Sequence, residues 1–167
     1  SEFSDLKQAL ISGGPSPPFP VSQRFFGIGT PDGALACCGE YTLFDYNTTG
    51  NAGAMMTQFQ LYGTGDPMAS NGFNDTRIRY YVDNEPVASV SYLLYLAHGM
   101  GASGAPVDVA WGTRRFGKSI GDRPSVYNTI RVPFTSRLRI TAELPPRCVR
   151  RQRYWLDVFG VEGLPVS

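Results

Sequence analysis

The side chains best suited to chemistry in this chain are its carboxylates. Hydrolysis of a glycosidic bond needs two of them, roughly 5 Å apart in retaining enzymes and about 6.5–9.5 Å apart in inverting ones. Asp83 and Glu85 flank Asn84, a pattern typical of a tight turn, and Asp157 alternates with apolar residues as an exposed strand position does. These three are weak catalytic candidates. The other acids in or beside predicted strands are Glu40, Asp45, Asp108 and Glu143, and no pair stands out by spacing.

Histidine and cysteine offer little further chemistry. His98 is the single histidine, and no nucleophile signature adjoins it, so we expect it to line a groove or face solvent. The three cysteines are Cys37, Cys38 and Cys148. An odd number excludes a complete disulfide framework, but a bond from Cys148 to Cys37 or Cys38 and three free thiols both remain open. Adjacent cysteines make a poor zinc site, so we expect no metal and no cofactor.

Aromatic rings and planar polar side chains favour glycan binding, because sugars present apolar C–H faces and fixed hydroxyl groups. Aromatic residues make up 13% of the chain. The predicted ligand-binding residues are Tyr92, Tyr95, His98, Trp111, Arg114, Tyr127 and Asn128. The same rings could instead fill the core of a sandwich. Nucleic-acid binding is not expected, since the net charge is only +1 and no recognition motif is present.

Alternating apolar and polar residues predict half-buried strands that position these side chains. Nineteen Gly and 13 Pro in 167 residues interrupt the chain too often for long helices. Residues 1–23 combine a possible cloning remnant, a short helix and a Pro-rich arm, and residues 24–167 form one domain. We predict an all-β antiparallel sandwich of jelly-roll type, with eight or nine short strands and an extended N-terminal arm. The strand candidates are 35–38, 41–46, 55–62, 78–82, 87–96, 107–111, 126–134, 138–144 and 154–159.

Two tripeptides match the acceptor for N-glycosylation, at Asn47 and Asn74, both in predicted loops. They favour a secreted or cell-surface protein. No apolar run approaches the roughly 20 residues of a membrane-spanning helix. Ser1-Glu2-Phe3 resembles a cloning remnant, so the lack of a signal peptide carries no information about export.

Residues 77–101 and 127–143 resemble a bacterial family catalogued as domain of unknown function 2961 and recognised in part as glycoside hydrolase family 172. The resemblance rests on the order of short motifs rather than on any one of them. These motifs are Tyr81-Val82-Asp83-Asn84-Glu85-Pro86, Ala88-Ser89-Val90, His98-Gly99-Met100-Gly101, Tyr127-Asn128, Pro133-Phe134, Arg139-Ile140-Thr141 and Tyr154-Trp155-Leu156-Asp157. It implies a jelly roll and, for the enzymes, rings of subunits with glycan sites between them.

The chain departs from that family where the chemistry would be. In place of the family's Gly-Asp-Phe-Phe-Gly block it carries Leu94-Tyr95-Leu96-Ala97-His98-Gly99, which lacks the carboxylate, and it has the length of one jelly roll instead of two. The resemblance therefore implies a non-catalytic module that binds glycan, forms a homo-oligomer, or both. A glycoside hydrolase with a site completed at a subunit interface is the alternative, and a capsid-like or matrix structural subunit is the second.

Overall fold

A computed structural model describes residues 24–35, 39–50, 52–63, 76–97, 111–119, 125–144 and 152–164 of the chain. About three quarters of them lie in strands. The strands are β1 (Arg24–Leu35), β2 (Gly39–Asn47), β3 (Gly53–Gly63), β4 (Arg77–Val82), β5 (Val90–Leu93), β6 (Trp111–Gly112), β7 (Phe116–Ser119), β8 (Ser125–Asn128), β9 (Val132–Phe134), β10 (Arg137–Leu144) and β11 (Gln152–Leu164). One helix of a single turn, α3 (Leu94–Ala97), follows β5. The predicted N-terminal arm lies outside the described residues.

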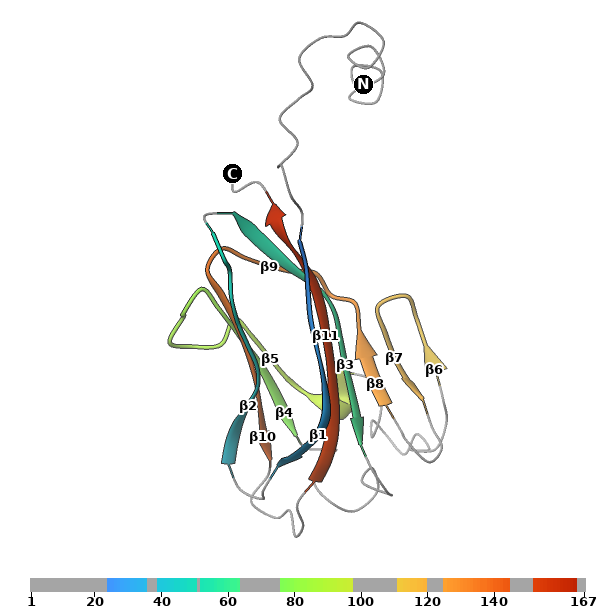
Figure 1. The fold of residues 1–167 in the computed structure, drawn as a ribbon. Coiled ribbons are helices and arrows are strands. Elements are labelled where there is room, and N and C mark those ends of the chain that lie inside the picture. Colours follow the sequence, from blue (N-terminus) through green and yellow to red (C-terminus); the bar gives the residue numbers. More distant parts are fainter. Residues whose placement is uncertain are drawn as a thin grey trace, which may run out of the picture.

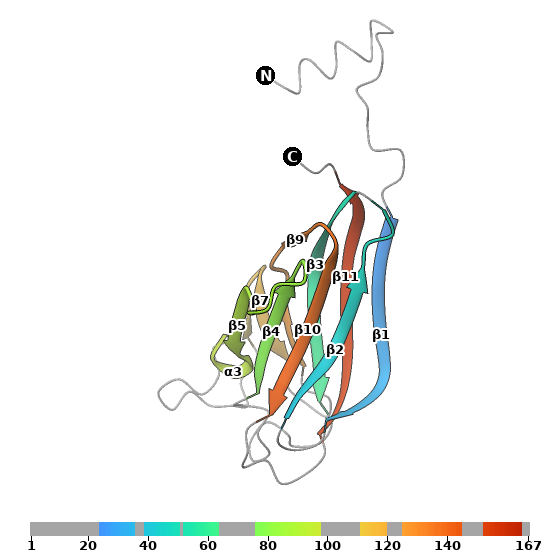
Figure 2. The same cartoon turned by 90° about the vertical axis from the view of Figure 1, so that its left-hand side faces the viewer.

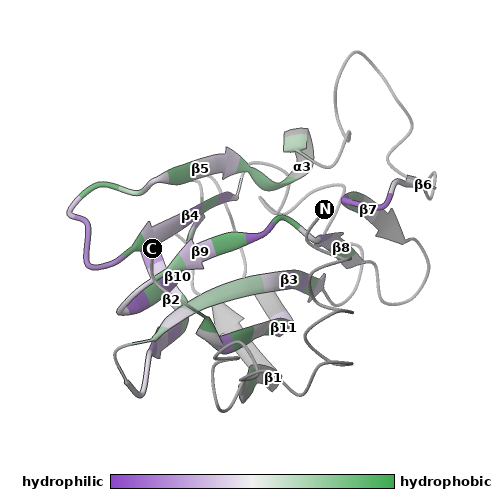
Figure 3. Cartoon of the chain, turned by 90° about the horizontal axis from the view of Figure 1, so that it is seen from above, coloured by the Kyte–Doolittle hydropathy of each residue, from purple (hydrophilic) through white to green (hydrophobic). Residues whose placement is uncertain are grey.

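The strands form two antiparallel sheets that pack face to face (Figure 1). The larger sheet has the order β1-β11-β3-β8-β7-β6, with β9 also paired to β3, and the smaller has the order β2-β10-β4-β5. Figure 2 shows the smaller sheet across the front of the molecule, and Figure 3 shows both layers from above. The predicted all-β antiparallel sandwich is confirmed, although the described residues contain eleven strands and not the eight or nine predicted.

The core lies between the two sheets and is built by alternation along the central strands. In β10, Leu138, Ile140, Ala142 and Leu144 are buried, whereas Arg137 and its alternate neighbours point outward. In β4, Ile78 and Tyr80 are fully buried, as the sequence pattern predicted. Each fully buried Leu or Ile side chain contributes about 1.5–3 kcal/mol through the hydrophobic effect, so these two strands anchor the smaller sheet.

Two predicted strands have different limits. The predicted strand 87–96 is only Val90–Leu93, because the Leu94 N–H turns to donate to the Thr76 carbonyl (2.9 Å) and helix α3 begins there. The predicted strand 126–134 is divided into β8 and β9, which pair with different parts of β3. Of the predicted short strand 35–38, only Leu35 is described, and it is the last residue of β1.

A bulge also disturbs the predicted alternation of β2. The pairing with β10 shifts between Ile140 and Thr141, and both Leu43 and Phe44 are buried as a result. An extra residue on one strand of an antiparallel pair turns the following side chains to the other face. Glu40 and Asp45 consequently both lie on the outer face of the smaller sheet.

Candidate functional site

The turn between β4 and β5 is held by the carboxylate of Asp83. Asp83 and Asn84 have positive φ angles, 50° and 64°, as both central residues of a type I′ hairpin turn require. The Asp83 carboxylate accepts hydrogen bonds from the backbone N–H groups of Thr135 (2.8 Å), Ser136 (2.6 Å) and Arg137 (3.3 Å). Burial acts to raise the pKa of Asp83, but these bonds outweigh it and lower the pKa to about 2.

The ionised Asp83 carboxylate therefore links its own turn to the turn between β9 and β10. It is unsuited to general acid catalysis, because a general acid must carry a proton that it can donate. Glu85, the second predicted catalytic candidate, is exposed and accepts a hydrogen bond from the hydroxyl of Ser89. These interactions account for both carboxylates as parts of the turn and of the loop after it.

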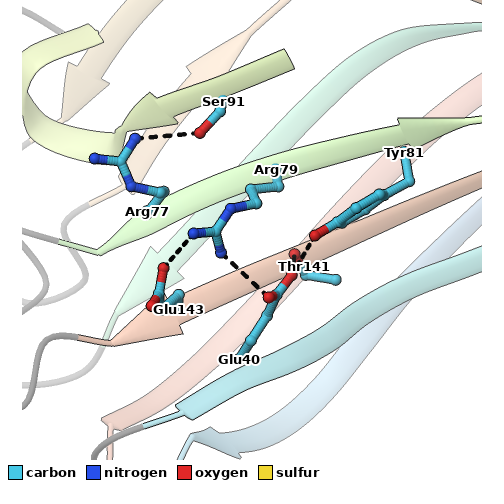
Figure 4. A network of polar contacts seen from close by, with 7 residues as sticks. All are labelled: Glu40, Arg77, Arg79, Tyr81, Ser91, Thr141 and Glu143. Atoms are coloured by element: carbon cyan, nitrogen blue, oxygen red, sulfur yellow. Dashed lines mark hydrogen bonds and ion pairs between the residues drawn. The ribbon is translucent and has the colours of Figure 1, made fainter. Parts of the chain in front are cut away.

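An ion-pair network covers the outer face of the smaller sheet (Figure 4). Arg79 on β4 lies between Glu40 on β2 and Glu143 on β10, with its Nη1 3.3 Å from the Glu40 carboxylate and its Nη2 hydrogen-bonded to Glu143. Glu40 also accepts hydrogen bonds from Thr141 (2.6 Å) and Tyr81 (2.8 Å). Burial alone would raise the pKa of Glu40, yet these bonds and the Arg79 charge give a net lowering.

Glu40 and Glu143 form a carboxylate pair that the sequence did not single out, because they become neighbours only through the β2–β10 register. The pair does not have the electrostatics of a glycosidase site. Such a site needs one carboxyl group with a raised pKa, whereas Arg79 bridges both carboxylates and the pKa of Glu40 is lowered. The network is better suited to holding three strands together.

Beside this network lies a pocket of about 340 Å³, lined by Tyr81, Asn84, Glu85, Arg137 and Arg139. The guanidinium of Arg139 lies over the Tyr81 ring, 4.1 Å from its centroid. Arg137 binds the Asp45 carboxylate through two hydrogen bonds of 2.7 and 2.5 Å, and chiefly for that reason the pKa of Asp45 is lowered. The pocket thus combines a fixed aromatic ring, two cations, an amide and a carboxylate.

Two predicted ligand-binding residues lie in the interior of the sandwich instead of at its surface. Asn128 is fully buried, and its amide donates to the hydroxyls of Tyr80 (3.3 Å) and Tyr92 (3.2 Å). The two hydroxyls lie 2.9 Å apart, and burial raises the pKa of Tyr80 to about 12. Tyr92 and Asn128 therefore satisfy one another's polar groups inside the core.

The outer face of the larger sheet carries Tyr127, another predicted ligand-binding residue. Its ring reaches over β7, where a Cβ added to Gly117 would be 2.4 Å from the ring. The phenol O–H donates to the Thr113 carbonyl (2.9 Å) and comes within 2.7 Å of where a Gly112 Cβ would be. The absence of a side chain at both glycines leaves room for the ring, and the hydrogen bond holds its outer end.

A second ring lies over a glycine on the same face, towards the opposite edge of that sheet. Phe159 on β11 is 45% exposed and covers Gly27 on β1, where an added Cβ would be 2.6 Å from the ring. Four strand spacings separate β1 from β7, which is about 19 Å at the usual spacing of roughly 4.8 Å.

Planar polar side chains occupy the strands between the two rings. Gln58 pairs with Phe159, Gln60 pairs with Asp157 and Tyr127, and the Gln58 amide donates to that of Gln60 (3.3 Å). Asp157, the third predicted catalytic candidate, accepts a hydrogen bond from Tyr62, whose pKa is raised by burial and by this bond. We name Tyr127, Gln60, Asp157, Gln58 and Phe159 the platform.

The remaining predicted site residues are scattered or lie beyond what the structure describes. Arg114 is exposed in the turn between β6 and β7, and its carbonyl accepts from Thr129 (2.7 Å). Asn47, a predicted glycosylation site, is the last residue of β2 and is exposed. His98, Asp108, Asn74, Cys37, Cys38 and Cys148 lie outside the described residues, as do the side chains of Tyr95 and Trp111.

Within the described ranges, no three His, Cys, Asp or Glu side chains gather as a metal site would require. The same ranges contain no helix with the length and apolar character needed to cross a membrane. Compared with known proteins, the chain matches no protein-family model and no curated protein sequence.

Proposed function

We propose that this chain is a non-catalytic jelly-roll module that binds glycan on the platform of its larger sheet. One observation carries the proposal: two aromatic rings occupy the space over glycines of neighbouring strands, with glutamine amides and a carboxylate between them. An aromatic ring on the surface of a sheet offers a π face on which the C–H face of a sugar can stack. Gln58, Gln60 and Asp157 can exchange hydrogen bonds with the sugar hydroxyls.

The spacing of the rings favours an extended oligosaccharide over a single sugar. The rings cover β7 and β1, about 19 Å apart, and the ligand would run across the strands between them. The platform carries a single charged side chain, that of Asp157, so an uncharged glycan suits it best. Because the Tyr127 ring is held by its hydrogen bond to Thr113 before binding, little of its side-chain entropy would be lost on association.

The jelly-roll assignment is supported by the order of the strands. The first strand, β1, pairs with the last, β11, and β2 pairs with the next to last, β10. β3 and β8 come next in the larger sheet, and β4 and β5 come next in the smaller one, as expected for two interlocked Greek keys. The proposed relation to the family of glycoside hydrolase 172 rests on this order together with the motifs in the sequence, and it concerns the scaffold rather than the chemistry.

The hydrolase alternative is less well supported by the described residues. The three candidate carboxylates already accept hydrogen bonds within the chain: Asp83 from backbone N–H groups, Glu85 from the Ser89 hydroxyl, and Asp157 from the Tyr62 hydroxyl. The pKa is lowered for Asp83 and for Glu40, opposite to what a catalytic acid needs. A capsid-like structural subunit would share the jelly roll, but its function would not require the Tyr127 and Phe159 rings of the platform.

Self-association is the second part of the proposal. In the described part of the larger sheet, β1 is an edge strand paired on one side by β11, and its Phe25 is 87% exposed. An unpaired edge with an exposed aromatic ring is suited to pairing with another copy of the chain. Light scattering should give a mass above that of one chain, and Phe25→Ser should reduce it. A monomer at all concentrations would contradict this part.

A panel of uncharged oligosaccharides tests the binding proposal, with affinity measured by calorimetry. We expect Tyr127→Ala to weaken binding roughly two- to tenfold, since one stacked ring contributes about 0.5–1.5 kcal/mol. Gly117→Ala should weaken it similarly, because the new Cβ would displace the ring. Val87→Ala removes an exposed apolar side chain elsewhere (76% exposed) and should leave affinity unchanged.

Two outcomes would overturn the proposal. One is binding that is insensitive to Tyr127→Ala in a folded variant. The other is hydrolysis of aryl glycosides that is abolished by changing Asp83, Glu85 or Asp157, since the module would then be an enzyme. Secretion is tested separately: expression in a eukaryotic secretory pathway should give a glycan at Asn47 that Asn47→Gln removes, and an unmodified secreted chain would argue against it.

A further inference from the structure

We propose that the pocket on the smaller sheet is a second, separate binding site, which takes a small carboxylate that also carries hydroxyl groups, with Arg139 as its anchor. This site lies on the opposite side of the sandwich from the platform and does not depend on the platform's function. Its chemistry is that of a sugar acid.

The first argument is the state of the Arg139 guanidinium. It lies 4.1 Å from the centroid of the Tyr81 ring, and among the described residues none accepts a hydrogen bond from it. A guanidinium stacked on a ring keeps its N–H groups directed sideways, in its own plane, and that fork matches the two oxygens of a carboxylate. The side chain is oriented by the ring and lines the pocket.

The second argument is that the nearby carboxylates are already bound to other donors. Asp45, which pairs with Arg139 across the strands, uses both oxygens on Arg137. Glu40 accepts from Tyr81 and Thr141 and forms its ion pair with Arg79. Arg139 affects both acids through its charge, since it contributes to their lowered pKa values. Its hydrogen-bonding capacity is left for a group that enters the pocket.

The third argument concerns the rest of the pocket wall. Glu85 and Asn84 line it together with Arg137 and Arg139. A bare anion would gain from Arg139 but would be repelled by the Glu85 carboxylate. A ligand that also carries hydroxyl groups would gain from Glu85, because a hydroxyl can donate a hydrogen bond to its carboxylate. Arg139 and Glu85 together would therefore recognise a ligand with a carboxylate at one end and hydroxyl groups at the other. The pocket volume of about 340 Å³ is within the usual range for small-molecule pockets.

Three ligands added to the full chain test both halves of the inference: glucuronate, glucose and acetate. Glucuronate has the carboxylate and the hydroxyls, glucose lacks the carboxylate, and acetate lacks the hydroxyls. We expect glucuronate to shift the NMR signal of the Arg139 side chain with millimolar affinity, and glucose and acetate to bind at least about tenfold more weakly. Raising the salt concentration should weaken glucuronate binding.

Variants locate the site. Arg139→Gln should reduce glucuronate affinity roughly tenfold or more, whereas Arg77→Gln, an arginine of the same face that donates to Ser91 (3.1 Å), should not. Tyr81→Phe keeps the ring under Arg139 and should preserve binding, but Tyr81→Leu should weaken it. Tyr127→Ala should leave glucuronate binding intact, which separates this site from the platform.

The inference is overturned if folded Arg139→Gln binds glucuronate as the parent does. It is overturned equally if acetate or glucose binds as tightly as glucuronate, or if glucuronate does not shift the Arg139 signal. Thermal unfolding of each variant shows that a loss of binding is not a loss of the fold.

Discussion

Replacing Asp83 with asparagine tests how the turn between β4 and β5 is stabilised. Asn and Asp both tolerate a positive φ angle, here 50°, so the backbone conformation should survive the change. The amide keeps one acceptor oxygen but has no charge. The variant therefore weakens the bonds from the N–H groups of Thr135, Ser136 and Arg137 while preserving size and shape.

The magnitude follows from the pKa of Asp83, which is about 2 in the folded chain against an ordinary value of 3.8. A difference of this size corresponds to roughly 2 kcal/mol of stability. Water reaches part of the carboxylate, so we expect about 1–2 kcal/mol at pH 7. Since the pKa is lowered on folding, the contribution is complete above about pH 4 and is lost as the pH falls towards 2. At pH 3 roughly half of it should remain.

Urea unfolding of the parent and of Asp83→Asn at several pH values between 7 and 3 measures the difference directly. At pH 7 the variant should also melt about 2–8 °C lower. Glu85→Gln is the matched control, because it neutralises an exposed carboxylate just two positions along the chain and should change stability by less than about 0.5 kcal/mol. An equal gap between Asp83→Asn and parent at pH 7 and pH 3, or no gap at pH 7, would refute the reasoning.

Two further predictions concern the interior. Tyr80→Phe removes a hydroxyl that accepts from the buried amide of Asn128 and should lower the free energy of unfolding by about 1–3 kcal/mol; denaturant unfolding with no loss would mean that the cluster contributes nothing. Gly160→Ala places a Cβ 2.5 Å from the Met55 carbonyl oxygen and should cost about 1–3 kcal/mol, whereas Gly50→Ala, with nothing within 4 Å, should change the melting temperature very little.

The sequence predicted the fold class and the central strands because one physical rule governs both. Side chains of a strand alternate between two faces, and burial of one face fixes which residues are apolar. Arg137 to Leu144 and Arg77 to Val82 follow that rule in their buried apolar positions, and the structure places both strands as predicted. The Asp83-Asn84 turn was equally predictable from the sequence, since Asp and Asn are among the residues that adopt positive φ readily.

Bulges and strand ends were not predictable in this way, because they depend on contacts from distant parts of the chain. The bulge beside Ile140 and Thr141 allows Leu43 and Phe44 both to face the core. Nothing in their own sequence distinguishes that arrangement from regular alternation. Likewise, Leu94 begins a helical turn because its N–H reaches the Thr76 carbonyl, a partner that a local pattern does not contain.

The alternation of side chains along a strand also bears on the predicted binding residues. Tyr127 and Asn128 were grouped as ligand-binding residues because they are adjacent, yet adjacent residues of a strand face opposite ways. Val126 and Asn128 lie in register with the buried residues Leu61 and Phe59, so Tyr127 alone of the three faces outward. Alternation along the strand is by itself enough to separate Tyr127 from Asn128.

The surroundings of the Tyr127 ring could not have been found from its own strand. Its ring has room over β7 because glycine occupies the facing position there, and the ring of Phe159 has room because Gly27 faces it on β1. Strand order and register decide which glycine meets which ring, and both are properties of the whole sandwich. If glycine was selected at these positions to seat the rings, restoring a side chain there should impair binding more than stability. Gly117→Ala therefore distinguishes a binding platform from a chance arrangement of surface aromatics.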